Sequence, residues 1–210
     1  MGVITIRGQL GSGAPEIGRE VATRLNFDYL DREIIAEVAA RLHRQEQEVI
    51  AKEMPPRSFL GRIAKALEHS YDFGVGFEGA YLPSWQMPLD DRRYLQALES
   101  VIKELAQNQS LVIYGRGSQF ILKGFPNTLH IFVVAPLKLR EERLRQARQL
   151  DLESARREID RFDNSNREFI KRYFKADWED PAGYDLVINT EYLSYSAAAS
   201  IIIEALAHKK

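Results

Sequence analysis

Short apolar runs alternate with longer amphipathic segments along this chain. The short runs are rich in β-branched residues and lie next to turn residues, which is typical of buried strands. Apolar residues at helical spacing fill the stretches between them. Alternating strands and helices predict an α/β fold with a parallel sheet and crossover helices on both faces. The predicted strands are 3–6, 27–30, 111–114, 130–134 and 185–188.

The helix after the first strand has the clearest helical spacing. Ile17 and Val21 lie on one face, and Pro15 suits the first turn, where no N–H is needed. Asp31 is expected to cap the next helix. Residues 74–89 mix glycine and proline breaks with aromatic side chains, which indicates an ordered loop over a site or a flap that binds a partner. The other predicted helices are 44–54, 57–70, a segment from Tyr94 to Leu105, 137–175 and 194–207.

A glycine-rich loop directly follows the first strand. Gly8 and Gly13 occupy the first and sixth positions of the phosphate-binding pattern G-x-x-x-x-G-K-[ST], and Ala14 stands where the pattern has lysine. A glycine turn between strand and helix offers backbone N–H groups and a helix dipole to a phosphate. A tight turn without a ligand is the alternative. The residues expected to bind nucleotide phosphates are Gly8, Gly11, Ser12, Gly13 and Ala14.

The missing lysine raises the question of what replaces it. Arg7 precedes the loop and Arg19 lies one turn into the helix, so either could reach the β- and γ-phosphates. The hydroxyl of the pattern is also absent, and Glu16 could replace it as a catalytic Mg²⁺ ligand, because carboxylate oxygen suits a hard cation. The alternative for Glu16 is an ordinary acid favoured by the helix N-terminus.

Three further arginines are candidates for phosphate contacts. Arg116 follows the strand 111–114, at the sheet edge where α/β proteins bind ligands, although pairing with a carboxylate is the alternative. Arg140 and Arg143 lie on one helical face and suit a lid that brings positive charge to a transferring phosphoryl group. Acidic residues are interleaved with these arginines, so a salt-bridged hairpin is the alternative there.

Composition narrows the function classes. The chain has 210 residues and contains no cysteine. Its formal net charge of −1 gives no indication of nucleic acid or of an acidic membrane surface as partner. The histidines are scattered without metal-ligand spacing. No signal peptide and no apolar run long enough to span a bilayer are recognised, so we expect a cytoplasmic protein.

Taken together, these motifs resemble the cytidylate kinase-like family of nucleoside monophosphate kinases, over nearly the whole chain. The resemblance depends on the order and spacing of its pieces. They are Ile4-Thr5-Ile6 with Gly11-Ser12-Gly13 and Glu16-Ile17-Gly18; Asp28-Tyr29-Leu30-Asp31 with Glu33-Ile34-Ile35; Val112 to Gly117; Val134-Ala135 with Arg140 and Arg143; and Asp177-Trp178, Asp180-Pro181 and Tyr184 to Thr190.

The resemblance implies a single P-loop kinase-like domain over 1–210, whose five parallel strands follow the order 2-3-1-4-5. It implies a helical acceptor-binding insert at 45–95 and an arginine-rich lid at 137–177. The implied activity is transfer of the ATP γ-phosphoryl group to a nucleoside monophosphate of the CMP or dCMP kind, with Mg²⁺. The alternative is a catalytically weak or inactive nucleotide-binding sensor that acts through a protein partner at 74–89.

The resemblance also implies roles for individual residues. Arg116 would hold the acceptor phosphate, and Arg140 and Arg143 would neutralise the transferring group. Asp31, Asp163 and Arg167 would contribute to the substrate site. The chain departs from the family in the loop, where cytidylate kinases carry Lys and Thr in place of Ala14 and Glu16. It also departs in the lid pattern Asp-x-x-Arg, where Asp163 is followed by Asn166 and then Arg167.

Overall fold

A computed structural model describes residues 1–31 and 92–209 of the chain. In this part the chain forms one parallel sheet in the order β2-β3-β1-β4-β5, which confirms the predicted fold and strand order. Each strand falls on a predicted apolar run. The strands are β1 (Val3–Gly8), β2 (Asp28–Leu30), β3 (Leu111–Tyr114), β4 (Thr128–Val134) and β5 (Leu186–Asn189).

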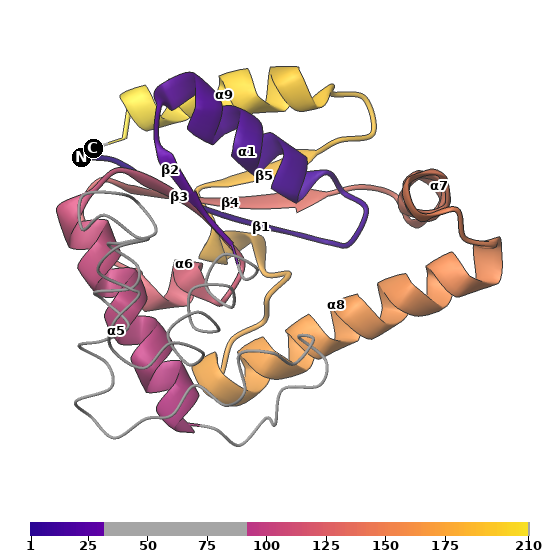
Figure 1. The fold of residues 1–210 in the computed structure, drawn as a ribbon, viewed down its shortest axis with the longest axis horizontal. Coiled ribbons are helices and arrows are strands. Elements are labelled where there is room, and N and C mark those ends of the chain that lie inside the picture. The colour runs from indigo at the N-terminus through magenta and orange to yellow at the C-terminus, as the bar shows by residue number, and fades with distance from the viewer. Residues whose placement is uncertain (32–91, 210) are drawn as a thin grey trace, which may run out of the picture.

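Helices cover both faces of this sheet. α1 and α9 pack together on one face, and α5, α6 and α8 lie on the other (Figure 1). α7 lies beyond the end of the sheet opposite to the chain termini and packs against α8 (Figure 1). The helices are α1 (Ala14–Leu25), α5 (Arg92–Asn108), α6 (Ser118–Ile121), α7 (Leu137–Arg148), α8 (Leu152–Phe174) and α9 (Tyr195–Ala207), with a 3₁₀ turn, η2 (Pro181–Gly183).

The central strand β1 sends alternate side chains into two different environments, as a strand must. Ile4 and Ile6 are fully buried in the apolar core under α1 and α9. Thr5 and Arg7 are buried as well, but both are polar. The Thr5 hydroxyl is hydrogen-bonded to His130 Nδ1 at 2.8 Å. The opposite face of β1 is therefore a buried polar surface whose last member, Arg7, directly precedes the glycine loop.

A second, aromatic core lies between β4 and α8. Phe132 of β4, Ile170 of α8 and the fully buried Trp178 form its centre. The Phe132 ring stacks on Tyr184 at 4.9 Å and meets Trp178 edge-on at 5.6 Å. This core fixes the segment after α8 against the sheet, which places Trp178 beneath the end of β1.

Local signals account for where the helices begin. Pro15 stands in the first turn of α1, as predicted. Asp151 caps α8 by accepting a hydrogen bond from the Ser154 N–H at 2.7 Å, and Ser194 caps α9 in the same way from Ala197 at 3.1 Å. The helices in 137–175 and 194–207 are confirmed, whereas the short α6 was not predicted.

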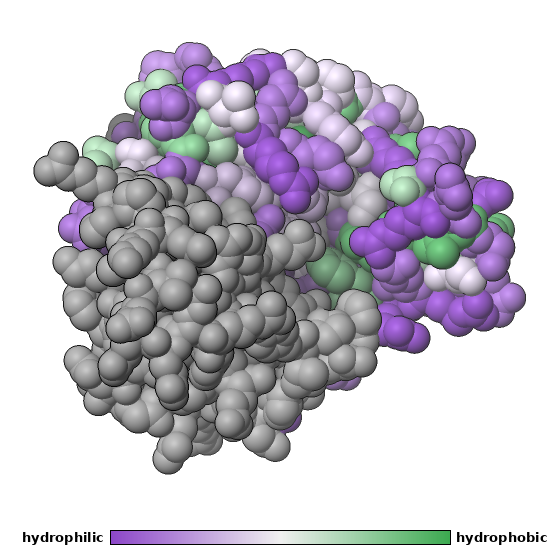
Figure 2. All heavy atoms as spheres, in the orientation of Figure 1, coloured by the Kyte–Doolittle hydropathy of each residue, from purple (hydrophilic) through white to green (hydrophobic). Residues whose placement is uncertain are grey.

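Several predicted segments lie outside the described residues. They are the helix that Asp31 is expected to cap, the helices 44–54 and 57–70, the flap at 74–89 and nearly all of the insert at 45–95, apart from the beginning of α5. The predicted lid at 137–177 corresponds to α7, α8 and the turn after them. Its surface is mostly hydrophilic (Figure 2). In the described ranges, no helix combines the length and apolar character that crossing a membrane requires.

Gly117 is predicted to be a stability determinant. Its φ is +67°, and a Cβ there would lie 2.5 Å from the Phe174 ring. Gly124 has a similar φ of +76°, but a Cβ there would meet no atom within 4 Å. A substitution at Gly124 therefore measures the cost of the left-handed backbone alone. We expect Gly117→Ala to lower the free energy of unfolding by about 2 kcal/mol more than Gly124→Ala does, because the ring must shift. Urea unfolding of both variants measures this. Equal losses of unfolding free energy in the two variants would show that the Phe174 ring shifts without an energetic penalty.

Candidate functional site

The glycine loop between β1 and α1 is closely enclosed. Gly11 and Gly13 have φ values of +82° and +88°, in the left-handed region that favours glycine. A Cβ on Gly11 would lie 2.8 Å from the backbone oxygen of Arg140, and one on Gly13 would lie 2.2 Å from the Tyr195 ring. Both positions therefore require glycine for two reasons. The turn needs a positive φ, and a side chain would clash with α7 or α9.

The loop leads directly into the N-terminus of α1. The Ile17 N–H donates to the Gly13 carbonyl at 3.0 Å, which is the first bond of the helical pattern. Amides before this point, those of Ala14 and Glu16, have no helical acceptor of their own. Ser12 is fully buried, and its Oγ has no partner among the described residues. These donors, with the helix dipole behind them, form the kind of cradle that binds phosphate.

Arg140 of α7 and Asp163 of α8 grip the loop at Leu10. The Arg140 guanidinium donates to Asp163 Oδ2 at 2.7 Å and to the Leu10 carbonyl at 3.3 Å. The other oxygen of Asp163 accepts the Leu10 N–H at 3.2 Å. Both side chains are nearly buried, and burial raises the pKa of Asp163, while Arg140 and the Leu10 N–H oppose that rise. The pair thus bonds both backbone polar groups of Leu10, one in each of two successive loop peptides.

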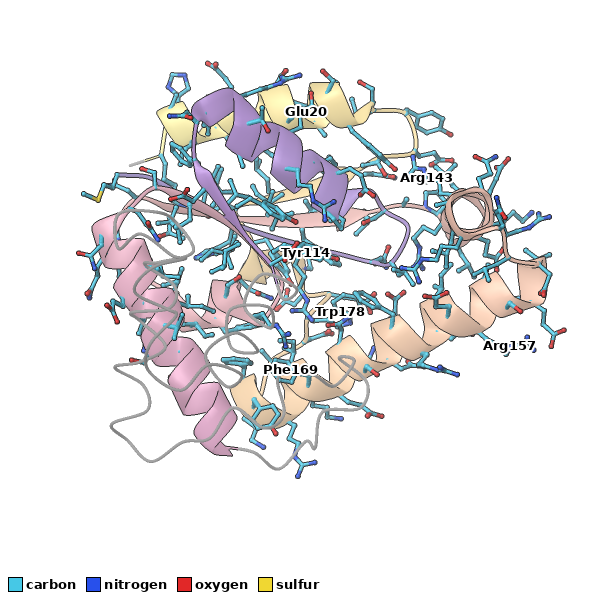
Figure 3. All side chains as sticks on the ribbon, viewed as in Figure 1. Glu20, Tyr114, Arg143, Arg157, Phe169 and Trp178 are labelled. Atoms are coloured by element: carbon cyan, nitrogen blue, oxygen red, sulfur yellow. The ribbon has the colours of Figure 1, made fainter. Side chains whose placement is uncertain are left out.

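Arg143 holds the next part of the loop, together with Thr190 from the end of β5. Its guanidinium donates to Thr190 Oγ1 at 2.9 Å, to the Thr190 carbonyl at 2.8 Å and to the Gly11 carbonyl at 3.3 Å. Thr190 Oγ1 in turn donates to the Ser12 carbonyl at 2.8 Å. The guanidinium also lies over the Tyr195 ring, 5.3 Å from its centre, which is a cation–π contact. Figure 3 shows Arg143 between α7 and the loop before α9.

The structure therefore brings both predicted lid arginines to the loop, but only one of the two charges is compensated by a carboxylate in the described ranges. Arg140 is compensated by Asp163 at 2.7 Å. Arg143 forms no ion pair in the described ranges and bonds only to neutral oxygens. Whether either one touches a transferring phosphoryl group stays a prediction.

Arg167 reaches the loop only indirectly. It forms an ion pair with Glu179 at 3.0 Å, and Glu179 accepts a hydrogen bond from Gln9 Nε2 at 3.1 Å. Gln9 also accepts the Ala135 N–H at 3.4 Å. The backbone just after β4 and side chains from α8 and from the segment after α8 thus meet at the beginning of the loop.

Arg116 lies at the same edge of the sheet as the loop, because β3 is the neighbour of β1. Its φ is +61°, and Gly115 and Gly117 on either side have φ values of +77° and +67°. Left-handed backbone is unusual for arginine, and such conformations concentrate at functional sites. The Gly115 N–H donates to the Ile6 carbonyl at 2.9 Å and so ties this turn to β1.

Asp31 follows β2, which lies on the same side of β1 as Arg116, and Arg19 of α1 lies close to Asp31. Arg19 approaches Asp31 to 3.6 Å and lies over the Tyr29 ring at 5.3 Å. Asp31 is nearly buried, whereas Arg19 is about half exposed. Of the two arginines considered as substitutes for the loop lysine, Arg19 is thus paired with a carboxylate.

The donor set fits a Mg²⁺ ion that is held mainly by the phosphates of a substrate. The described residues contain no group of three or more His, Cys, Asp or Glu side chains that could hold a metal by themselves. Mg²⁺ in phosphate sites usually takes one or two carboxylates, several waters and the phosphates. Glu16 is exposed in the first turn of α1 and forms no ion pair in the described part of the chain. That Glu16 holds the ion stays a prediction.

Several contacts of this site have no local sequence signal. Thr190, Tyr195 and Trp178 come from distant parts of the chain, and their roles arise only when β5, α9 and the segment after α8 pack against the loop. Thr190 and Trp178 belong to the C-terminal pieces of the family resemblance, which did not assign them a task. Tyr195 could have been noticed only as an aromatic residue that follows a helix cap.

A parallel sheet of this order, with a glycine loop between β1 and α1, defines the phosphate-binding-loop kinase fold. The chain belongs to the cytidylate kinase-like family, whose model matches residues 3–192. The cytidylate kinase of Methanopyrus kandleri is 26% identical over 212 residues, which cover 97% of this chain and 92% of that protein. Another cytidylate kinase, from Methanocella arvoryzae, is 24% identical over 97% of this chain and 96% of its own length.

A solved structure supports the fold independently. The structure of an uncharacterized protein from Eubacterium ventriosum matches with a TM-score of 0.72 at 18% identity and covers 100% of both chains. At this level of identity the likeness shows the fold alone.

The Arg140–Asp163 pair is predicted to stabilise the loop strongly. Removing one partner of a buried ion pair typically costs about 3–5 kcal/mol, because the other charge is left uncompensated. We therefore expect Arg140→Met and Asp163→Leu each to lower the free energy of unfolding by about 3 kcal/mol. The double variant should lose much less than the sum, as urea unfolding will measure.

The exposed pair Arg157–Glu153 on α8 is the matched control, and its removal should change stability little. Additive losses from Arg140→Met and Asp163→Leu would show that the two side chains act separately.

Proposed function

We propose that this protein transfers the γ-phosphoryl group of ATP to a nucleoside monophosphate of the CMP or dCMP kind. The proposal is carried by one observation above all: a glycine loop with the geometry of a phosphate cradle lies at the carboxyl edge of β1, beside Arg116 at the end of β3. Family membership and cytidylate kinase relatives that align over nearly the whole chain support the same reaction.

The chemistry asks little of the side chains beyond position and charge. An oxygen of the acceptor phosphate bonds to the γ-phosphorus while the bond from that phosphorus to the β,γ-bridging oxygen breaks. ADP leaves with the electron pair, and the acceptor becomes a nucleoside diphosphate. Because the second pKa of a phosphate monoester is about 6, the attacking oxygen carries no proton at neutral pH and needs no side-chain base.

The residues of this chain then divide the work. The loop amides bind the donor phosphates, and Arg116 binds the acceptor phosphate. Arg143 faces the growing charge, because it is the lid arginine without a carboxylate partner in the described ranges. Arg140 and Asp163 keep the loop in position for this reaction. Glu16 and the phosphates would hold a Mg²⁺ ion, which would supply charge neutralisation during the transfer.

Ala14 favours a second candidate function, a nucleotide-binding protein with weak or no turnover. It is fully buried and brings no ammonium to the loop. Deleting one donor aimed at developing charge typically lowers a rate by about 10²–10³-fold. A protein of this kind would bind ATP and act through a partner instead of releasing ADP.

ADP formation from Mg·ATP is expected to depend on the acceptor. A panel of CMP, dCMP, UMP, AMP and GMP should give the fastest turnover with CMP or dCMP. Arg116→Ala should raise the KM for the acceptor at least tenfold, because it removes a bidentate phosphate contact. Arg157→Ala, on the exposed outer side of α8, is the matched control and should behave as the unmodified protein does.

Two results would contradict this assignment. ADP release at the same rate with and without every acceptor would indicate a hydrolase. ATP binding by calorimetry without any ADP formation would favour the second candidate function.

A further inference from the structure

Arg7 is a buried cation without a buried anion of its own. The side chain is 4% exposed, and its guanidinium bonds to a single neutral acceptor, Asn166 Oδ1, at 2.8 Å. Its Nε has no partner in the described part of the chain, where the residue forms no ion pair either. A buried charge is ordinarily paired, because removing it from water is costly. An unpaired one next to a phosphate loop needs an explanation.

Neighbouring charges do not provide the missing anion. Among the described residues, the carboxylate that acts electrostatically on Arg7 is Asp163, and Asp163 already pairs with Arg140 at 2.7 Å. Two guanidiniums thus share one carboxylate, and the group keeps an excess positive charge. Burial accordingly lowers the pKa of Arg7, which nevertheless stays protonated as arginine does.

Arg7 lies next to the glycine loop. It directly precedes Gly8, the first residue of the loop, at the carboxyl end of β1. Tyr114, at the end of β3, interacts with it electrostatically, and the next two residues of the chain lead to Arg116. The guanidinium therefore lies between the glycine loop, the end of β3 that leads to Arg116, and α8.

The packing around Arg7 holds the guanidinium in one place. Its carbon atom lies 5.1 Å from the centre of the Trp178 ring, and Trp178 is fixed by Phe132 and α8. Figure 3 shows Trp178 beneath the sheet, between the strands and α8, with Tyr114 above it. A cation stacked on an aromatic face loses little freedom when an anion arrives, so the charge is prepared in advance.

We propose that Arg7 is a catalytic residue that contacts the transferred phosphoryl group and supplies the positive charge that Ala14 cannot. The inference rests on the proposed function for its catalytic part. Its binding part, a guanidinium on the terminal phosphate of bound ATP, can be tested without turnover.

The contact with Asn166 makes a sharp test possible. Exchanging the two side chains, in the double variant Arg7→Asn/Asn166→Arg, moves the guanidinium from β1 to α8 while keeping the charge and the hydrogen-bonding groups in the same place. Arg7→Asn alone removes the charge, and Asn166→Arg alone puts two guanidiniums together. Arg157→Asn on the outer side of α8 is the control for losing an arginine.

We expect Arg7→Asn to lower kcat with CMP about 100-fold or more and to weaken binding of the non-hydrolysable ATP analogue AMP-PNP with Mg²⁺ at least tenfold. Its effect on ADP binding should stay below threefold, because ADP lacks the terminal phosphate. The double variant should regain at least tenfold of the lost kcat and of the AMP-PNP affinity. A purely structural role would weaken both nucleotides alike.

Wild-type kcat and AMP-PNP affinity in Arg7→Asn would overturn the inference, and so would losses that the double variant does not recover. An unmodified protein that binds AMP-PNP but never forms ADP would contradict the proposed function, while the difference between AMP-PNP and ADP binding would still decide the role of Arg7. If Arg7→Asn unfolds at the assay temperature, recovery in the double variant decides, since it restores both partners.

Discussion

One ion pair bonds both backbone polar groups of Leu10, and the site depends on this arrangement. Arg140 donates a hydrogen bond to the Leu10 carbonyl, and Asp163 accepts one from the Leu10 N–H. Arg140 and Asp163 also bond to each other. The loop is thereby attached to α7 and α8. Without this attachment, the loop would depend on the contacts that Arg143, Thr190 and Tyr195 make with it, and the amides of α1 would offer a phosphate a less fixed geometry.

The charge of the site follows from the same contacts. A phosphate loop of the usual pattern carries its own ammonium, whereas here Ala14 is buried and neutral. Positive charge comes instead from residues that flank the loop: Arg7 beneath it and Arg143 beside it, neither of which forms an ion pair in the described ranges. Both guanidiniums are held by aromatic rings, Trp178 and Tyr195. The cations are thus built into the fold around the loop.

Local patterns predicted the strands and the α/β fold class, but only part of the site. Apolar runs and the Pro15 helix start predicted the strands and α1, because burial of a parallel strand leaves a continuous apolar signature. The strand order came from the family resemblance. The loop glycines and the proximity of Arg140 and Arg143 to the loop could also be anticipated. The tasks of Thr190, Tyr195 and Trp178 could not, since they exist only through tertiary packing, and neither could the difference between a compensated Arg140 and an uncompensated Arg143.

The central claim is that a loop without lysine supports phosphoryl transfer between nucleotides. Its most direct test is to incubate the protein with Mg²⁺, CMP and ATP that is radiolabelled at the γ-phosphate, and to separate the nucleotides by chromatography. The account predicts label in CDP, formed in step with unlabelled ADP. Label that remains in ATP, or that appears only as inorganic phosphate, would contradict it.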